Sequence, residues 1–196
     1  MIATGPAGRR RGRGARERIT AAAAEMFYSH GIHATGVDRL IETANVSKRT
    51  FYQHFPSKQQ LIEDYLRGYE DQGGTPLEQR LSDVDAPPRE RLLAIFDPPA
   101  AGPFRGCPFH NAAVESAGVL GAVDDIVRAH KLRFGERLAA VAAEAGAPEP
   151  QVLARRLMVL FEGATALSTS VGDTSPMGDA RAAATILIDR ETKEKP

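Results

Sequence analysis

The 196-residue sequence has a single cysteine, no long apolar run and no net charge, and these absences narrow the possible protein classes. With Cys107 alone, we expect neither an internal disulfide framework nor a multi-cysteine metal site. No stretch approaches the roughly 20 consecutive apolar residues that a membrane-spanning helix needs. The arginines near the N-terminus precede neither an apolar stretch nor a cleavage site, so we expect no signal peptide, no membrane partner and a cytoplasmic protein.

Common catalytic motifs are also missing from the sequence. It contains no glycine-rich phosphate loop, no His-Glu-x-x-His metal motif and no Gly-x-Ser-x-Gly nucleophile elbow. An all-α enzyme is therefore an alternative without a supporting motif, and we predict no catalytic residues, no metal and no cofactor. The content of 42% hydrophobic and 26% charged residues is that of an ordinary globular protein.

The charges are distributed unevenly along the chain. Residues 1–58 contain ten Lys or Arg and four Asp or Glu, whereas residues 59–196 contain fifteen and twenty-one. The arginines of the first segment are interleaved with glycines: Arg9, Arg10, Arg11, Arg13, Arg16 and Arg18. Such a segment suits DNA phosphates or a minor groove, although a solvated tail would have the same composition. The sequence thus predicts a basic head on an acidic body.

The hydrophobic pattern predicts an all-α fold, because apolar residues recur at helical spacing and no convincing alternating strand pattern occurs. A first helix is expected to end at Gly31. Thr35 is predicted to cap a second helix, with Asp38 in the capping-box position. Asn45 tolerates left-handed geometry and Ser47 is a good N-cap, so a third helix follows within three residues. This spacing predicts a helix-turn-helix.

The third helix is predicted over residues 48–55, because Pro56 disfavours helical geometry at the residue before it. Phe51 and Phe55 lie four residues apart and are expected to pack inward, which leaves the polar side chains of this helix on the other face. Ser57 and Gln60 form a second predicted capping box, which begins a fourth helix.

The segments Thr35-Gly-Val-Asp-Arg-Leu-Ile and Asn45-Val-Ser-Lys-Arg-Thr-Phe-Tyr-Gln-His-Phe-Pro-Ser-Lys resemble the N-terminal signature of TetR-type regulators, over residues 15–62. The resemblance implies phosphate contacts by Thr35, Ser47, Lys48, Tyr52, His54 and Lys58, and base contacts by Arg49, Thr50 and Gln53. The alternative interpretation of Tyr52 is a packing residue, and that of the two lysines is solvated charges without a DNA contact. We expect no metal role for His54, because it is a lone histidine. Asn45 and Arg49 stand where the family often has Gly, and Arg49 is predicted to add a guanine contact.

We predict a flexible basic arm over residues 1–14, a helix-turn-helix DNA-binding domain over 15–62 and a ligand-binding and dimerisation domain over 63–190. Chain breaks at 71–76 and 85–88 separate further helices, which are predicted over 89–96, 122–145, 150–171 and 177–189. The resemblance implies that the last two long helices pair with their copies in a homodimer. Ordinary packing within one chain is the alternative.

By the same resemblance, the body encloses an apolar pocket for a small-molecule effector. The candidate lining residues are Phe104, Cys107, Phe109, Asn111, Glu115, Phe134, Met158, Phe161 and Glu162. Pro108 suits a first helical position, which places Cys107 at a helix N-terminus, where the dipole favours a reactive thiolate. A small buried apolar residue is the alternative interpretation of Cys107.

The sequence therefore predicts a dimeric, ligand-responsive regulator, in the first place a repressor, that binds double-stranded operator DNA of near-palindromic sequence. An activator is equally compatible with the sequence, because the sign depends on where the operator lies. A non-specific or architectural DNA-binding protein without a ligand is the alternative of another class.

Overall fold

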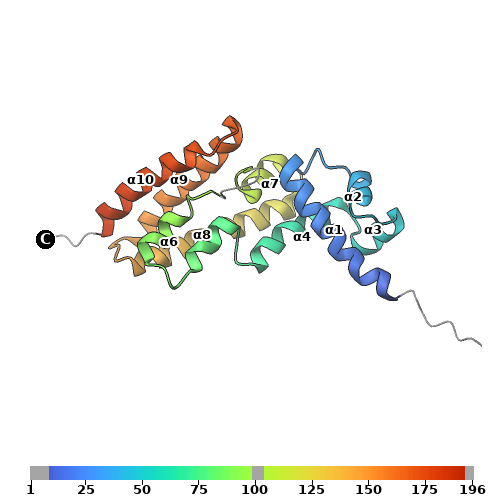
Figure 1. Ribbon diagram of the computed structural model, residues 1–196, viewed down its shortest axis with the longest axis horizontal. Helices are drawn as coiled ribbons and strands as arrows, with labels where there is room; N and C mark the ends of the chain where they lie inside the picture. The colour runs from blue at the N-terminus through green and yellow to red at the C-terminus, as the bar shows by residue number, and fades with distance from the viewer. Residues whose placement is uncertain (1–8, 99–103, 193–196) are drawn as a thin grey trace, which may run out of the picture.

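The computed structural model describes residues 9–98 and 104–192, and side chains from residue 14 onward. Every regular element in these ranges is a helix, so the all-α prediction is confirmed. Figure 1 shows an elongated molecule, with α1, α2 and α3 at one end, α6, α9 and α10 at the other, and α4 and α7 between them. None of the helices described is both long and apolar enough to cross a membrane.

The element bounds follow the chain in a simple order. The helices are α1 (Arg9–His30), α2 (Val37–Thr43), α3 (Lys48–His54), α4 (Lys58–Asp71), α5 (Pro76–Gln79), the 3₁₀ helix η1 (Arg80–Ser82), α6 (Pro88–Ala94), α7 (Pro108–Ser116), α8 (Gly121–Glu144), α9 (Pro150–Val171) and α10 (Ser175–Thr192). The long helices of the body were predicted to within two or three residues at each end. The short elements α5 and η1 were not predicted, because each is too short to show a helical period.

The turns of the head form where the sequence predicted them. Gly31 follows α1 with φ 93° and Asn45 follows α2 with φ 49°, so both adopt the left-handed geometry that ends a helix. Ser47 accepts the backbone N–H of Thr50 and caps α3, and Ser57 accepts that of Gln60 and caps α4. These turns join α1 to α2, α2 to α3 and α3 to α4.

Two local predictions in the head are wrong. The N-cap of α2 is Gly36, and the Thr35 side chain is fully buried, with its hydroxyl donating to the carbonyls of Met26 and Gly31. The Gln60 amide donates to Asp64 on the same helix, so Ser57 caps α4 without the reciprocal bond of a capping box.

The predicted arm is partly helical. Because α1 begins at Arg9, residues 9–14 continue this helix, and residues 1–8 of the predicted arm lie outside the part of the chain that is described. The boundary predicted between residues 62 and 63 falls inside α4, which is a single helix from Lys58 to Asp71.

Two apolar cores lie side by side along the molecule. The head core contains Ile19, Phe27, Leu40, Phe51 and Phe55, and it continues into Phe109 of α7 and Val123 of α8. The body core is formed by α6, α8, α9 and α10 around Phe96, Phe134, Leu157 and Phe161. Because α8 contributes to both cores, the head is packed on the body rather than tethered to it.

Leu157 is fully buried in the body core, so we expect Leu157→Ala to lower the free energy of unfolding by about 2–5 kcal/mol. Urea denaturation followed by circular dichroism measures the change. Val84 is 84% exposed, and Val84→Ala should stay within about 0.5 kcal/mol of the wild type. Equal effects of the two substitutions would contradict the assignment of this core.

Candidate functional site

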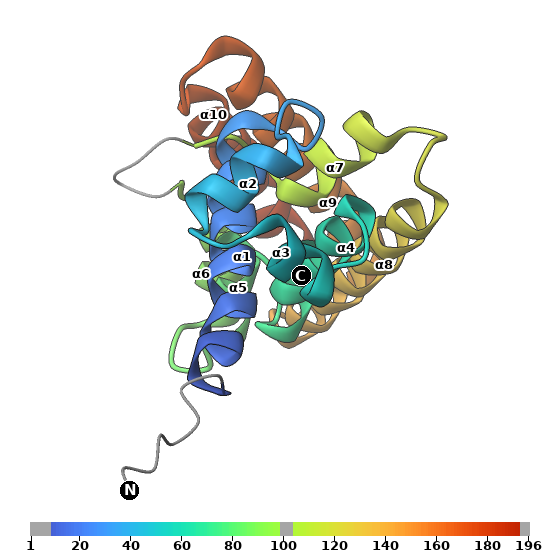
Figure 2. The same cartoon turned by 90° about the vertical axis from the view of Figure 1, so that its right-hand side faces the viewer.

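The outer face of α3 carries a cluster of polar side chains. Phe51 and Phe55 are fully buried and anchor the helix, whereas Lys48, Arg49, Tyr52 and Gln53 are exposed. Figure 2 looks along the molecule from this end, where α2 and α3 lie in front of the rest of the chain. Sequence and structure therefore agree on which face of α3 is free to contact another molecule.

The predicted lysines differ in their surroundings. Lys48 is exposed and lies 3.4 Å from the Asp38 carboxylate in a solvated ion pair, which contributes little to stability. Lys58 is half-buried at the start of α4. Burial lowers the pKa of Lys58, and the negative charge of Glu115 acts in the opposite direction. Lys48 is the first residue of α3, and Lys58 is the first residue of α4, four residues after α3 ends.

Three predicted contact residues are occupied in the protein itself. Thr35 is withdrawn as a phosphate contact, because its buried hydroxyl already donates to two backbone carbonyls. The hydroxyls of Ser47 and Thr50 lie 2.8 Å apart and bond to each other, so they serve first to begin α3. His54 is half-buried at the end of the helix.

Two arginines of the basic N-terminal segment, Arg16 and Arg18, hold the head together. Arg16 pairs with Asp64, donates to the His54 carbonyl at 3.3 Å and lies 4.6 Å from the centroid of the Phe55 ring. Arg18 donates to the Ala44 carbonyl at the end of α2, at 3.0 Å. Their first role is therefore to fix α2, α3 and α4 against α1.

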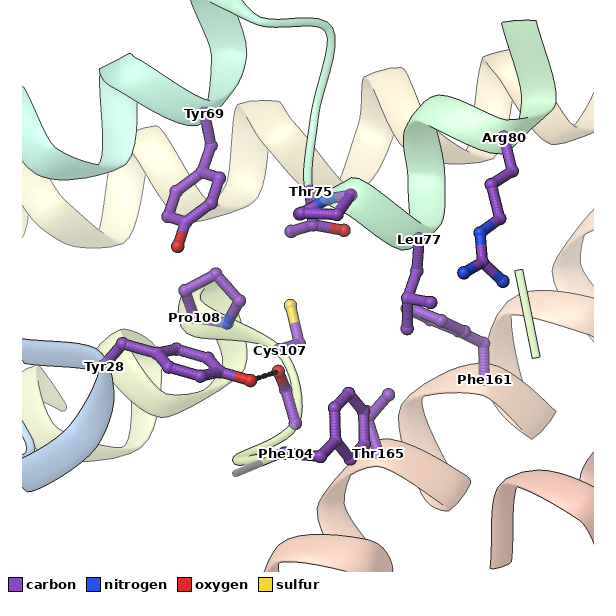
Figure 3. Close-up of a pocket in the computed structure, with 12 residues that line it drawn as sticks. Tyr28, Tyr69, Thr75, Leu77, Arg80, Phe104, Cys107, Pro108, Phe161 and Thr165 are labelled. Carbon is purple, nitrogen blue, oxygen red and sulfur yellow. Dashed lines mark hydrogen bonds between the residues drawn. The ribbon is translucent and has the colours of Figure 1, made fainter. Parts of the chain in front are cut away.

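A cavity of about 230 Å³ lies where the head meets the body. Figure 3 shows side chains from α1, α4, α5 and α9 converging on it together with the segment before α7. Its lining residues are Tyr28, Tyr69, Thr75, Pro76, Leu77, Arg80, Phe104, Gly106, Cys107, Pro108, Phe161 and Thr165. Of the nine predicted pocket residues, the structure brings Phe104, Cys107 and Phe161 together here.

The other six predicted pocket residues lie elsewhere. Phe109 and Phe134 are fully buried core residues, and Met158 lines a separate hollow between α8 and α9. The remaining three hold the chain together: Asn111 donates to the Arg105 carbonyl, Glu115 accepts from His33, and Glu162 pairs with Lys131. These aromatic and polar residues thus serve mostly in core packing and in hydrogen bonds or ion pairs within the chain.

The residues that sequence reasoning missed come from distant parts of the chain. Tyr28, Tyr69, Thr75, Arg80 and Thr165 all line the cavity. Tyr28 and Tyr69 lie on helical faces that are otherwise part of the head, and Thr75 and Arg80 belong to the unpredicted short elements. No local pattern joins them, so only the packing of the helices could reveal this site.

Hydrogen bonds connect the cavity wall to the head. The Tyr28 hydroxyl on α1 accepts the Arg105 backbone N–H at 3.0 Å and donates to the Gly106 carbonyl at 3.4 Å, as Figure 3 shows for the second bond. The Glu115 carboxylate on α7 accepts the His33 backbone N–H at 2.8 Å. Both contacts run from the body to the segment around the end of α1.

A buried histidine lies behind the cavity. His130 of α8 is 2% exposed, with Nδ1 against the Glu70 carboxylate and Nε2 3.1 Å from that of Glu78. Its ring stacks on Phe109 of α7, with 3.4 Å between the ring centroids. Glu78 in turn accepts the backbone N–H of Thr75, which lines the cavity.

Cys107 is the N-cap residue of α7, as predicted, but its thiol is not activated. Burial raises the pKa of the Cys107 thiol to about 11, and Lys131, whose Nζ lies 3.4 Å from Sγ, only partly opposes this effect. The burial of Cys107 and the raised pKa of its thiol both favour the alternative of a small buried residue over that of a reactive thiolate.

We expect Cys107 in the folded protein to react with a disulfide reagent at pH 8 on the order of a hundredfold more slowly than a free thiol, because so little of it is ionised. The rate should rise as the pH approaches 11. Absorbance of the released thiolate measures the reaction, and the protein unfolded in urea is the control. A folded-state rate equal to the unfolded one would contradict the assignment.

Comparison with known proteins points to one family. The sequence model of "Bacterial regulatory proteins, tetR family" matches residues 19–65. The chain is 36% identical over 82 residues to the transcriptional activator FasR of Mycolicibacterium smegmatis, and 33% identical over 81 residues to the transcriptional repressor KstR2 of the same organism. These matches cover 42% and 41% of this chain but only 37% and 39% of the two relatives.

Solved structures extend the similarity to the body. A TetR-family transcriptional regulator from Streptomyces coelicolor has 27% sequence identity and a TM-score of 0.71, over 92% of this chain and 97% of its own. A TetR regulator from Chloroflexus aurantiacus shares the fold at 24% identity, with a TM-score of 0.76 over 93% of this chain and 98% of its own. Together with the matched head and its exposed α3, these similarities show that the head matches the TetR-family sequence model and that the whole chain has the fold of TetR-family transcriptional regulators.

Proposed function

We propose that this protein is a transcriptional regulator that binds DNA through α3 and is released from it by a small molecule. The observation that carries the proposal is the arrangement of α3. Two buried phenylalanines fix the helix, while Arg49, Tyr52 and Gln53 project from the head into solvent. A helix presented in this way fits the major groove of B-DNA, and the family match covers the same residues.

Within this proposal the residues on α3 and at the start of α4 divide into two groups. Arg49 and Gln53 carry the donors and acceptors that distinguish base edges, and Arg49 suits a bidentate contact with guanine. Lys48, Tyr52, His54 and Lys58 are proposed as phosphate contacts, which set the register of the helix without reading the sequence. The hydroxyls of Ser47 and Thr50 already bond to each other, so they can contact DNA only with their remaining hydrogen-bonding capacity.

We infer a homodimer from the outer face of α9 and α10. This face carries the exposed apolar residues Val159, Leu167, Val171 and Ile186, beside shallow apolar hollows at Leu160 and Leu187. Gly163 lies among them with open space where a Cβ would be, which permits close approach of another helix. A two-fold dimer would offer two α3 helices to successive major grooves, about 34 Å apart, and so favour a near-palindromic operator.

The proposed effector site is the cavity at the junction. Its wall includes Tyr28 on α1, and the hydrogen bonds of Tyr28 to residues 105 and 106 tie α1 to the same wall. Because α1 is part of both the wall and the head, a ligand that binds more tightly to one position of this wall would also stabilise one position of the head. A coupling of about 1–3 kcal/mol is typical between two such sites and is enough to release DNA.

Fluorescence anisotropy tests the proposal, with the protein titrated onto labelled DNA from upstream of its own gene and onto a scrambled duplex, over a salt series. Tight, sequence-dependent binding is expected. Equal and steeply salt-dependent binding to both duplexes would instead indicate a non-specific DNA-binding protein. Absence of binding to either duplex and to duplexes selected from a random library would contradict the proposal.

Two substitutions separate base reading from phosphate binding. Arg49→Ala should lose about 1–3 kcal/mol of discrimination at one base pair, with little change in binding to scrambled DNA. Lys58→Ala should weaken binding to all sequences similarly and reduce the salt slope by about one. The same titrations measure both effects. If neither variant changes affinity or specificity, the assignment of α3 as the reading helix is wrong.

The dimer makes a separate prediction. Leu167→Arg places a charge on the proposed interface, so we expect a monomer in sedimentation velocity at concentrations where the wild type is a dimer. Val84→Arg is the matched control, since Val84 is exposed on the chain between η1 and α6. Loss of the dimer in both variants, or in neither, would count against this interface.

A further inference from the structure

The junction cavity carries one formal charge among its described lining residues, and that charge is the guanidinium of Arg80. We infer that the ligand of this cavity is a small amphipathic monocarboxylate, whose carboxylate binds Arg80 while its apolar part lies among the aromatic residues. The inference rests on the proposed function only in taking this cavity as the effector site. It adds the chemical class of the effector.

Arg80 is held in place without being neutralised. Its Nη1 donates to the backbone carbonyls of Ala94 at 2.8 Å and Asp97 at 2.5 Å, and both are uncharged groups. Within the described ranges no carboxylate lies at ion-pair distance from Arg80, and residues 99–103 contain no acidic residue. The cation is therefore oriented by the protein but left with its charge uncompensated.

The acidic groups of the surroundings are already engaged with other side chains. The Asp97 carboxylate lies 2.9 Å from Nε of Arg181, on α10. Glu78 accepts from His130 on α8, and Glu162 pairs with Lys131. None of these carboxylates lines the cavity. The wall thus has a positive end and no negative one.

The rest of the wall is mostly apolar. Leu77, Phe104 and Phe161 lie between Arg80 and the two tyrosines, which are at the other side of the cavity in Figure 3. A neutral ligand would remove water from the guanidinium without supplying a charge in return, which is costly at a partly buried cation. A carboxylate supplies that charge in the planar geometry that the guanidinium fork matches.

The size of the cavity limits the ligand. At about 230 Å³ it is smaller than the roughly 300–1,000 Å³ that drug-sized ligands occupy. A medium-chain fatty acid or a short arylalkanoic acid has suitable dimensions and one terminal carboxylate. Either would reach from Arg80 toward Tyr28 and Tyr69.

Isothermal titration calorimetry on the wild-type protein tests the inference with two matched pairs, octanoate against octanamide and 3-phenylpropanoate against 3-phenylpropanamide. Acid and amide in each pair have nearly the same shape and differ in charge. We expect at least one acid to bind roughly tenfold or more tightly than its amide, the size of one charge-assisted hydrogen bond. Amides that bind as tightly as the acids, or no binding by any of the four, would overturn the inference.

Two variants test whether Arg80 causes the preference for the acid over the amide. Arg80→Gln should reduce the acid-to-amide ratio to near unity, whereas Arg128→Gln, at an exposed position on α8, should keep it. Because the bonds of Arg80 to Ala94 and Asp97 also support the fold, thermal unfolding of each variant is measured first. If Arg80→Gln does not fold, Arg80→Lys retains the charge without the planar fork and should show a reduced but measurable preference. Retention of the full ratio in the variant that folds would overturn the inference.

A measurement of DNA release by the same four compounds distinguishes failure of this inference from failure of the proposed function. An acid that binds through Arg80 without releasing DNA supports the ligand class and removes the effector role of the cavity. Release of DNA by neutral compounds alone, with no binding of the acids, supports the regulator and overturns the carboxylate inference.

Discussion

The contact of His130 with two carboxylates organises the centre of this molecule. It joins the end of α4 through Glu70 and the start of α5 through Glu78, and its ring packs on Phe109 of α7. Because His130 and Glu78 are buried, removing either side chain would leave a buried polar group of the other without one of its hydrogen bonds, at a cost of about 1–3 kcal/mol. The relative positions of α4, α5, α7 and α8 therefore depend on this contact.

The junction cavity is a consequence of that arrangement. Glu78 completes the capping box of Thr75, so the same carboxylate that contacts His130 also orients the first turn of α5 on the cavity wall. On the opposite side, Tyr28 holds the segment before α7 by two hydrogen bonds. The head and the body thus meet through directional polar contacts around a space that apolar side chains fill only in part.

The sequence was most informative where structure is local. Gly31, Asn45 and Ser47 each act within a few residues of themselves, so the turns and the exposed face of α3 could be predicted from spacing alone. Thr35 was misassigned because a buried threonine that bonds to preceding carbonyls has the same spacing as a capping one. Only part of the cavity lining could be predicted, since Tyr28, Tyr69 and Arg80 are brought to Phe161 by tertiary packing alone and share no pattern in the sequence.

Helix α9 has a different role on each of its sides. Phe161 and Thr165 line the cavity, whereas Val159, Gly163 and Leu167, about half a helical turn away, lie on the face proposed for the second copy. In such a dimer the two cavities are separated from the interface by the thickness of one helix, roughly 10 Å. Occupation of one cavity would then act on the helix that the other protomer packs against, so the proposed interface would couple the two binding events through α9.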